Sequence, residues 1–562
     1  MAGRPFQAGL LQGRDPATAG AAPLRVVIVG GGPRGLWALQ SLLRSLDQAP
    51  PTQPVAVTVI EPHEHPGAGW VYDPDGPSAL RMNLASRHID ASGGERSFLD
   101  WAADRGEPVD GESFVPRATV GRYLADCFRR TCDAAPSGVS VSVRCDRVLR
   151  CVRSADVWQL RLASGDRLPA DELLLAIGHA ASGPVDGAAA DVSGIYPVDD
   201  RLSEERVPVG SRVALRGFAL TGIDAILALT EGRGGRFVEQ DGTLTYEPSG
   251  REPSCILPFS RTGQPMAVKP SQAVNERRGA DLIWARLRAE IDEAPATVAV
   301  IRSLAVDAAA ARYKLDRHHQ RKPTGTLWQS LLGRLNSPGA CDSVPADWQR
   351  SLDVAAGREP IDLDQSLGAA WRMLYPSIVN AVGFGRLPSG EVAAFREMAT
   401  RFERLAFGPP AASVERVLAL VRAGFVSFDQ SAGPTVGRTS SGWQIGEAAA
   451  DCLVDARIAP PGLTLPPDGT DDQGHGVRES LLATLASRGT IAVDPHWDAV
   501  RTEPDATAGP NLAIVGRATE GWILGHDTLQ RSMHDQIPRW ADRVAARSVA
   551  MASVVPPGVA AR

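Results

Sequence analysis

The sequence predicts an α/β protein with two nested Rossmann-like dinucleotide-binding domains and a mostly helical insert. Two short apolar segments, residues 24–29 and 212–216, each lead into a glycine-rich loop and then a helical pattern. Between about residues 278 and 400 the chain instead shows mainly helical periodicity. Strands that alternate with helices through glycine-rich loops are typical of doubly wound α/β domains.

The first loop, residues 30–35, reads G-x-G-x-x-G. Gly30 permits a tight turn, Gly32 lets the backbone approach a pyrophosphate, and Gly35 lets the helix pack closely on the strand. The N–H groups and positive dipole end of the following helix favour phosphate there. The loop therefore predicts a dinucleotide site, and its place near the start of the chain favours FAD.

The next predicted strand, residues 55–60, ends at Glu61. An acid at this place of a dinucleotide-binding unit accepts hydrogen bonds from the adenosine ribose. Residues 139–144, 147–153 and 157–162 alternate apolar and polar side chains, so we expect them to pair as antiparallel strands.

A buried strand is expected at residues 171–178, stopping at Gly178. A late one is expected at residues 512–516, stopping at Gly516. In flavoproteins built on two dinucleotide domains, strands that end in this way approach the flavin. We therefore expect the C-terminal part of the chain to close the first domain and to bring His526 to the flavin.

The second loop reads G-x-A-x-x-G, from Gly217 to Gly222. The second strand of this unit, residues 255–259, is followed by Ser260 and Arg261 rather than by an acid. A planar guanidinium suits the 2′-phosphate of NADP, whereas an acid suits the free ribose of NAD. The second unit is therefore predicted to bind NADPH.

These observations divide the chain into five parts. They are a disordered leader at 1–22, the first part of an FAD-binding domain at 23–205, an NADPH-binding domain at 206–300, a helical insert at 301–400, and a return segment at 401–562 that completes the FAD domain.

Composition excludes some partners. The net charge of −6 provides no basic field for nucleic acid. No apolar run approaches the length of about 20 residues that spans a membrane. The histidines are scattered without metal-ligand spacing, so no metal is expected. A cytoplasmic enzyme is the resulting expectation, and a homo-oligomer is left open.

Several short motifs carry a family resemblance across about residues 24–545. They are Pro-Arg-Gly-Leu at 33–36, Gly-Ala-Gly-Trp-Val-Tyr at 67–72, Met-Asn at 82–83, Phe-Val-Pro-Arg at 114–117, the run at 229–237 and Gly-Pro-Pro at 408–410. With them the chain resembles the large bacterial FAD/NAD(P)-binding flavoproteins. More narrowly, it is similar to flavin-dependent N-hydroxylating monooxygenases, including those that oxidise aspartate to nitrosuccinate.

Residues 171–184 keep the spacing of an N-hydroxylase signature but have Ile177 for threonine and His179 for tyrosine. The resemblance implies that NADPH reduces FAD, that O2 then forms a C4a-hydroperoxyflavin, and that the primary amine of a small polar, aspartate-like amino acid is hydroxylated. Two rivals stay open. They are an NADPH-dependent flavin oxidoreductase that does not oxygenate, and a non-catalytic flavin-binding regulator.

The candidate site residues fall into three groups. Asn83 and His179 are the candidate catalytic residues beside the flavin, and Arg81, Arg87 and Arg117 are candidates for holding a substrate carboxylate. The candidate cofactor-binding residues are Gly30, Gly32, Pro33, Arg34, Gly35, Glu61, Trp70, Met82, Asn83, Gly178, Gly217, Gly222, Ser260, Arg261, Thr262, Gly516 and His526.

Overall fold

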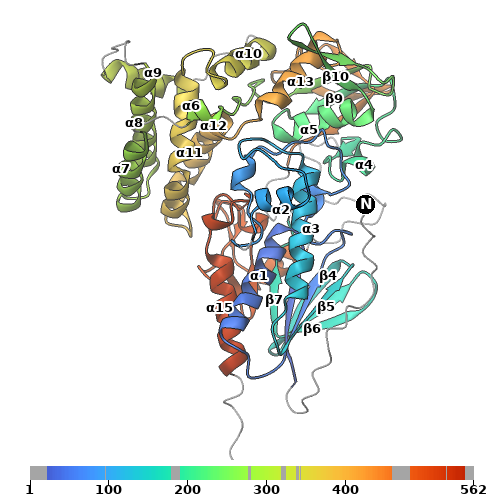
Figure 1. The fold of residues 1–562 in the computed structure, drawn as a ribbon, viewed down its shortest axis with the longest axis vertical. Coiled ribbons are helices and arrows are strands. Elements are labelled where there is room, and N and C mark those ends of the chain that lie inside the picture. The colour runs from blue at the N-terminus through green and yellow to red at the C-terminus, as the bar shows by residue number, and fades with distance from the viewer. Residues whose placement is uncertain are drawn as a thin grey trace, which may run out of the picture.

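The computed structural model describes residues 22–94, 96–178, 190–275, 280–317, 324–336, 341, 343–458, 481–526 and 528–550. The leader expected at 1–22 lies outside these residues except for its last position, and His179 also lies outside them. The predicted fold class is confirmed. Figure 1 shows a lower domain around α1 and β7, a second sheet domain around β9, and a separate group of helices around α8 and α11.

The first sheet has the order β19-β20-β7-β1-β2-β3. All of its strands run parallel except the edge strand β19, which is antiparallel to β20. Their bounds are β1 Leu24–Val29, β2 Val55–Ile60, β3 Val139–Arg144, β7 Glu172–Leu175, β19 Thr507–Gly509 and β20 Leu512–Ile514. The connection after β1 leads to β2 on one side, whereas β7 and β20 lie on its other side. This change of direction in the strand order creates a crevice at the carboxyl end of β1.

Both faces of this sheet are buried, and the residues of β1 alternate between them. Val26 and Ile28 face a core that includes α1 (Pro33–Gln48), α3 (Arg117–Asp133) and α15 (Gln536–Ala550), whereas Val27 and Val29 face a core that includes β4–β6. A near-continuous apolar run is what a parallel strand buried on both faces requires.

One strand prediction was wrong. Residues 139–144 do not pair with the antiparallel strands but form β3, parallel to β2 with Val57 opposite Val141. Its alternation of apolar and polar residues reflects an edge strand with one partly exposed face, a pattern that antiparallel strands share. The small antiparallel sheet consists of β4 (Val148–Ser154), β5 (Val157–Leu162) and β6 (Arg167–Ala170).

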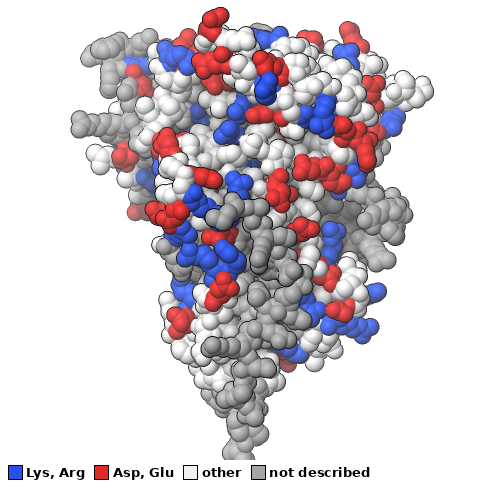
Figure 2. All heavy atoms as spheres, turned by 45° about the vertical axis from the view of Figure 1, so that its right-hand side comes forward, with Lys and Arg blue, Asp and Glu red and all other residues white. Residues whose placement is uncertain are grey.

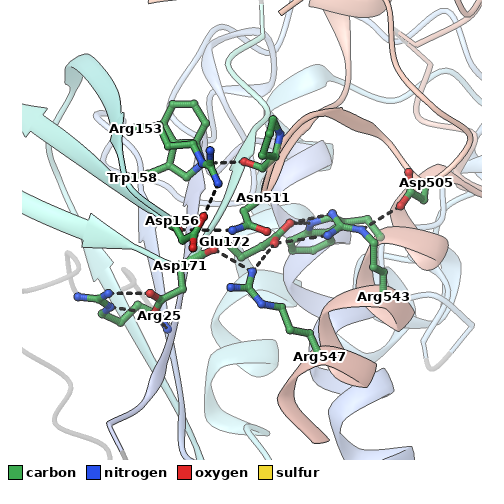
Figure 3. Close-up of polar contacts among 12 residues, drawn as sticks. Arg25, Arg153, Asp156, Trp158, Asp171, Glu172, Asp505, Asn511, Arg543 and Arg547 are labelled. Carbon is green, nitrogen blue, oxygen red and sulfur yellow. Dashed lines mark hydrogen bonds and ion pairs between the residues drawn. The ribbon is translucent and has the colours of Figure 1, made fainter. Parts of the chain in front are cut away.

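The amino ends of β1 and β7 carry a polar cluster that fixes α15 to the sheet (Figure 3). Asp171 accepts two hydrogen bonds from the Arg25 guanidinium, at 2.6 and 2.8 Å. Glu172 is fully buried and accepts hydrogen bonds from Arg543 at 2.8 Å and Arg547 at 3.2 Å, both on α15. Burial raises the pKa of Asp171, but the Arg25 hydrogen bonds outweigh this and hold it below its usual value. Asp171 therefore has a structural role, at the end of β7 opposite Gly178.

The second sheet has the order β12-β9-β16-β8, and its paired strands are parallel. Its bounds are β8 Val192–Ser193, β9 Arg212–Arg216, β12 Cys255–Phe259 and β16 Cys452–Asp455, with α5 Leu220–Leu229, α13 Ala411–Arg422 and the hairpin β10 Arg236–Gln240 and β11 Thr243–Glu247. β16 pairs with β9, so the chain first completes the second domain and only then, at β19 and β20, returns to the first. This sheet thus includes strands outside the expected domain limits of 206 and 300, because the sheet that a strand joins depends on its pairing with distant strands and not on its own sequence.

The helical unit begins before the expected residue 301 and ends after 400. Its helices are α7 Ala280–Glu293, α8 Val298–Asp316, α9 Thr324–Asn336, α10 Val344–Ala355, α11 Leu363–Val382 and α12 Val392–Ala406. Trp371 of α11 stacks on Phe402 of α12, with ring centroids 4.5 Å apart, at the centre of this core. α10 packs instead against the core of the second domain through Trp348.

Several short helices and strands connect or flank these units. They are α2 Phe98–Asp104, α4 Val198–Arg201, α6 Gln272–Asn275, α14 Leu481–Ser487, β13 Val436–Thr439, β14 Gly442–Ile445, β15 Ala448–Ala450, β17 Val493–Asp494 and β18 Ala499–Val500. Among the described residues, no helix combines the length and apolar character needed to cross a membrane. Acidic and basic side chains alternate over the described part of the face in Figure 2.

Candidate dinucleotide and substrate site

Four strands of the first sheet end at the same edge. The glycine loop follows β1, Glu61 follows β2, the segment to Gly178 follows β7, and Gly516 follows β20. Ligands of open α/β sheets bind outside the carboxyl ends of the strands, where the chain direction switches. The sheet therefore brings together residues that are almost 500 positions apart in the sequence.

Each glycine of the first loop is required for a different reason. Gly30 has a φ of +97°, and a Cβ there would lie 2.2 Å from the carbonyl oxygen of Ala176. A Cβ on Gly35 would lie 2.0 Å from the carbonyl oxygen of Gly30. Gly32 is different, because a Cβ there would come within 4 Å only of Gly69 Cα, at 3.9 Å. Open space in front of the α1 N-terminus is the cradle that an FAD pyrophosphate requires.

The segment at 67–72 lies over this loop. The N–H of Gly67 donates to the carbonyl of Gly31 at 2.6 Å, and a Cβ on Gly69 would lie 3.6 Å from Gly32 Cα. Trp70, which was predicted to contact a cofactor, follows directly and is 43% exposed, with its ring edge-on to His63. This segment thus forms the second wall of the cradle.

Glu61 is buried and its carboxylate already binds backbone groups. Its Oε2 accepts the N–H of Gly31 at 2.6 Å, and its Oε1 accepts the N–H of His63 at 2.9 Å. Glu61 therefore holds the glycine loop in shape, and its predicted contact with a ribose stays a prediction.

The return segment closes the site through His526 and Arg34. The N–H of Gly516 donates to His526 Nδ1 at 2.8 Å, and the Arg34 guanidinium donates to the carbonyl oxygens of His526 and Thr528 at 2.8 and 3.2 Å. Burial, followed by the charge of Arg34, holds the pKa of His526 well below its usual value. His526 is therefore neutral, as its acceptor role at Nδ1 requires.

Met82 packs in the core of the first domain, and Asn83 beside it contacts the helical unit. Met82 is buried, and its N–H donates to the carbonyl of Val115 at 2.9 Å. Asn83 donates from Nδ2 to the carbonyl of Phe407 at 3.4 Å. Phe407 lies edge-on to Tyr375 of α11, with ring centroids 5.0 Å apart. Asn83 is thus placed where the first domain meets the helices.

The three candidate substrate arginines differ in their partners. Arg117 lies 3.0 Å from Asp224 of α5, and the Tyr196 hydroxyl donates to the same carboxylate at 2.6 Å. Burial alone would lower the pKa of Arg117, but the charge of Asp224 raises it, so the guanidinium stays ionised. Arg87 forms an ion pair with Glu112. We assign both a structural role, Arg117 as a link between the two domains.

Arg81 remains a candidate. Its Nη1 donates to the carbonyl of Phe114 at 3.3 Å, and its buried Nε has no hydrogen-bond partner within the described residues. Burial lowers the pKa of Arg81.

The second glycine loop repeats the first. Gly217 has a φ of +91°, and a Cβ on Gly222 would lie 2.2 Å from the carbonyl oxygen of Gly217. Ala219 caps α5 with the same extended backbone that Gly32 has before α1. The predicted second dinucleotide-binding unit is present. The methyl group of Ala219 stands where the first loop has Gly32.

The residues predicted to contact a phosphate follow β12, the second strand of this unit. Ser260 Oγ accepts the N–H of Gly263 at 3.0 Å, and Thr262 Oγ1 accepts the N–H of Gln264 at 3.4 Å. Arg261 is exposed, and the described residues provide no hydrogen bond or ion pair to its guanidinium. Its predicted contact with a 2′-phosphate stays a prediction that this geometry allows.

Sequence reasoning did not find two cations near Asn83, Lys269 and Arg372. Lys269 is one of only three lysines in a chain that otherwise uses arginine, and this rarity was the one available signal. Arg372 lies in the middle of an apolar helix, α11, where no local pattern marks it.

One group of potential metal ligands is found among the described residues. His65, Asp73 and Asp75 have ligand atoms within 4.8 Å of one another, and His65 Nε2 lies 2.8 Å from Asp75. They are partly or fully exposed, and acids gathered at a surface are common without a metal. We assign no metal to them.

Residues 27–180 match the profile of a family described as FAD-NAD(P)-binding. A nitrosuccinic acid synthase of Aspergillus oryzae is 34% identical over 284 residues, which cover 46% of this chain and 43% of that protein. An L-aspartate N-monooxygenase (nitrosuccinate-forming) of Streptomyces cremeus is 30% identical over 302 residues, which cover 43% of this chain and 42% of that protein. The chain thus spans less than half the length of these relatives.

Among solved structures, an ornithine N-hydroxylase of Kutzneria sp. 744 aligns with 94% of this chain and 100% of its own, at 14% identity and a TM-score of 0.45. The family match covers the end of β1, the first glycine loop, Glu61 and Gly178. Residues 27–180 therefore form an FAD-NAD(P)-binding domain.

Proposed function

We propose that this protein is an FAD- and NADPH-dependent monooxygenase that hydroxylates the primary amine of a small, aspartate-like amino acid. The observation that carries the proposal is its 30–34% identity with two proteins named for forming nitrosuccinate. Two dinucleotide-binding units in one chain support it, because such an enzyme needs one unit for the flavin and one for the nicotinamide cofactor.

The proposed reaction converts R-NH2, O2, NADPH and H⁺ into R-NHOH, NADP⁺ and H2O. Bound FAD would accept hydride from NADPH and activate O2, and the protein supplies the positions. The first glycine loop and the α1 N-terminus would hold the FAD pyrophosphate, while the Arg34 contacts fix the return segment beside it.

Asn83 is the proposed positioning group for the substrate amine. Its uncharged amide can hold an amine by hydrogen bonds without giving it a proton. An amine must be unprotonated to act as a nucleophile, so kcat should rise with pH until another group titrates. The predicted role of His179, and a cytoplasmic location, stay predictions.

The test uses the purified holoenzyme with L-aspartate, following NADPH and O2 consumption together with the hydroxylated product by mass spectrometry. A monooxygenase consumes NADPH and O2 in step with product. Product formed without O2 would instead identify a dehydrogenase, and no turnover with any amino acid or small amine would favour a regulator.

Asn83→Ala should uncouple the reaction, so that NADPH is still consumed but hydrogen peroxide replaces product. Asn380→Ala, at an exposed position of α11, is the matched control and should behave as the wild type. Equal coupling in the two variants would remove Asn83 from the proposed site.

A further inference from the structure

Three elements from different parts of the fold converge on residues 406–409, just after α12. Asn83 donates to the carbonyl of Phe407, Arg372 donates from Nη1 to the carbonyl of Ala406 at 3.0 Å, and the N–H of Lys269 donates to the carbonyl of Pro409 at 2.9 Å. A Cβ on Gly408 would lie 1.7 Å from the carbonyl oxygen of Ala267, so this packing is tight. The first domain, the loop after β12 and α11 therefore meet at one short segment.

Two positive side chains lie at this junction, and the described residues give neither of them an acidic partner. The other Arg372 contact is to the amide oxygen of Asn275, at 3.5 Å, and no ion pair to Lys269 or Arg372 is found in the described part of the chain. Burial and, to a lesser extent, the nearby charge of Arg372 together lower the pKa of Lys269 to about 7. Both residues keep part of their surface exposed.

The same junction borders the predicted flavin site. Tyr375 lies one turn along α11 from Arg372, and its Cε1 is 3.2 Å from the position of a Cβ on Gly525. Gly525 precedes His526, whose Nδ1 accepts the N–H of Gly516 at the end of β20. One helical turn and one contact thus connect Arg372 to the segment that carries His526.

A purely structural role explains only part of this arrangement. A guanidinium that donates to the last carbonyls of α12 is a common helix C-cap, and the negative end of the α12 dipole favours nearby cations. That role accounts for Arg372, but it gives no partner to the Lys269 ammonium group. Two like charges that are close together and partly removed from water repel one another, and an anion bound between them would relieve that repulsion.

We infer that Lys269 and Arg372 bind a carboxylate of the substrate beside Asn83, and so restrict the enzyme to anionic amino acids. This inference rests on the proposed function, since it places the substrate at the junction with the flavin site. A carboxylate can accept both charge-assisted hydrogen bonds at once, while the amine of the same molecule lies toward Asn83.

The test measures binding to the FAD-loaded enzyme by calorimetry, with succinate and succinamide as probes. Succinate has two carboxylates and no amine, so its binding does not depend on any hydroxylation. Succinamide has the same length but no charge. We expect succinate and L-aspartate to bind, and succinamide to bind at least about tenfold more weakly, because each charge-assisted hydrogen bond is lost.

Lys269→Met and Arg372→Gln should each weaken succinate binding by about 10- to 100-fold. Lys314→Met and Arg161→Gln make the same changes at exposed positions and should leave it unchanged. Lys269→Arg keeps the charge and should retain binding within a few-fold even if Lys269→Met folds poorly. The KM for NADPH should stay unchanged in all five variants.

Unchanged succinate binding in both Lys269→Met and Arg372→Gln would overturn the inference. A raised KM for NADPH with unchanged succinate binding would also overturn it, since the pair would then bind a cofactor phosphate. If succinate binds as expected but no amino acid is oxidised, the proposed reaction fails while the carboxylate site stands.

Discussion

The two glycine loops of this protein share one backbone arrangement and differ at the position before the helix. Both begin with a glycine at positive φ, +97° at Gly30 and +91° at Gly217. In both, the glycine five positions later packs against the carbonyl oxygen of the first. The position between them is Gly32 in the first loop and Ala219 in the second. The glycines therefore give both units the same turn and helix packing, and the methyl group of Ala219 leaves less room for a phosphate than Gly32 does.

The two units differ more at the end of their second strands. Glu61 follows β2 and ties down the glycine loop, whereas Ser260 and Arg261 follow β12 and leave the guanidinium exposed. Beyond these strand ends, both units reach the junction at residues 406–409. The first unit supplies Asn83 there, and the second supplies Lys269. The acid after the second strand of the first unit is therefore buried and hydrogen-bonded, whereas the arginine after the second strand of the second unit is exposed.

Gly32→Val tests the central difference and should have the largest effect. A Cβ on Gly32 would come within 4 Å only of Gly69 Cα, at 3.9 Å, so we expect the fold to survive while the pyrophosphate position is blocked. We expect a folded protein by circular dichroism that purifies without flavin absorbance. Ala219→Val should retain the flavin and lose NADPH affinity, and a yellow Gly32→Val protein would show that the cradle assignment is wrong.

Asp224→Asn tests the connection between the two units. It leaves the buried charge of Arg117 without its carboxylate, which should lower the free energy of unfolding by about 3–5 kcal/mol. Urea denaturation measures this change. Asp166→Asn breaks an exposed ion pair with Arg144 and should cost less than about 1 kcal/mol. Similar losses in both variants would contradict the role of Arg117 as a buried link.

Arg261→Ala tests the open basic end of the second unit. Loss of one charge-assisted phosphate contact should raise the KM for NADPH by about 10- to 150-fold and leave the KM for NADH nearly unchanged. Steady-state kinetics with each cofactor measures both KM values. Equal changes for NADPH and NADH would rule out a contact between Arg261 and the 2′-phosphate.

The pH dependence of succinate binding tests the junction that the two units share. The pKa of Lys269 is about 7 in the folded protein, below its usual 10.5, so the folded protein binds fewer protons than the unfolded chain between these values. Lys269 therefore opposes folding least at high pH, whereas carboxylate binding needs its charged form. Burial and the charge of Arg312, which is ion-paired with Asp316, lower the pKa of Arg372 to about 10, so Arg372 stays charged in this pH range.

Succinate affinity should therefore fall by about tenfold between pH 6 and pH 8, as Lys269 loses its proton. Lys269→Arg should remove this dependence, because arginine stays charged across the range. A wild-type affinity that is flat with pH would place the Lys269 ammonium outside the binding contact.

The sequence by itself determined both dinucleotide units. A glycine required for backbone conformation or close packing leaves a fixed spacing, as at Gly30 and Gly35 or at Gly217 and Gly222, and such local constraints can be read without a partner. It also predicted that the last strand and His526 return to the first domain, because residues 512–516 form a short apolar run that stops at Gly516.

Only the tertiary structure decided which side chains share a site. The carboxylate partner of Arg117 lies 107 positions away, and the sequence carries no sign of that pairing. β3 and β16 were placed in their sheets by pairing with distant strands rather than by their own patterns. Lys269 and Arg372 meet Asn83 only at residues 406–409, because hydrogen bonds and charge act between neighbours in space, whatever their separation along the chain.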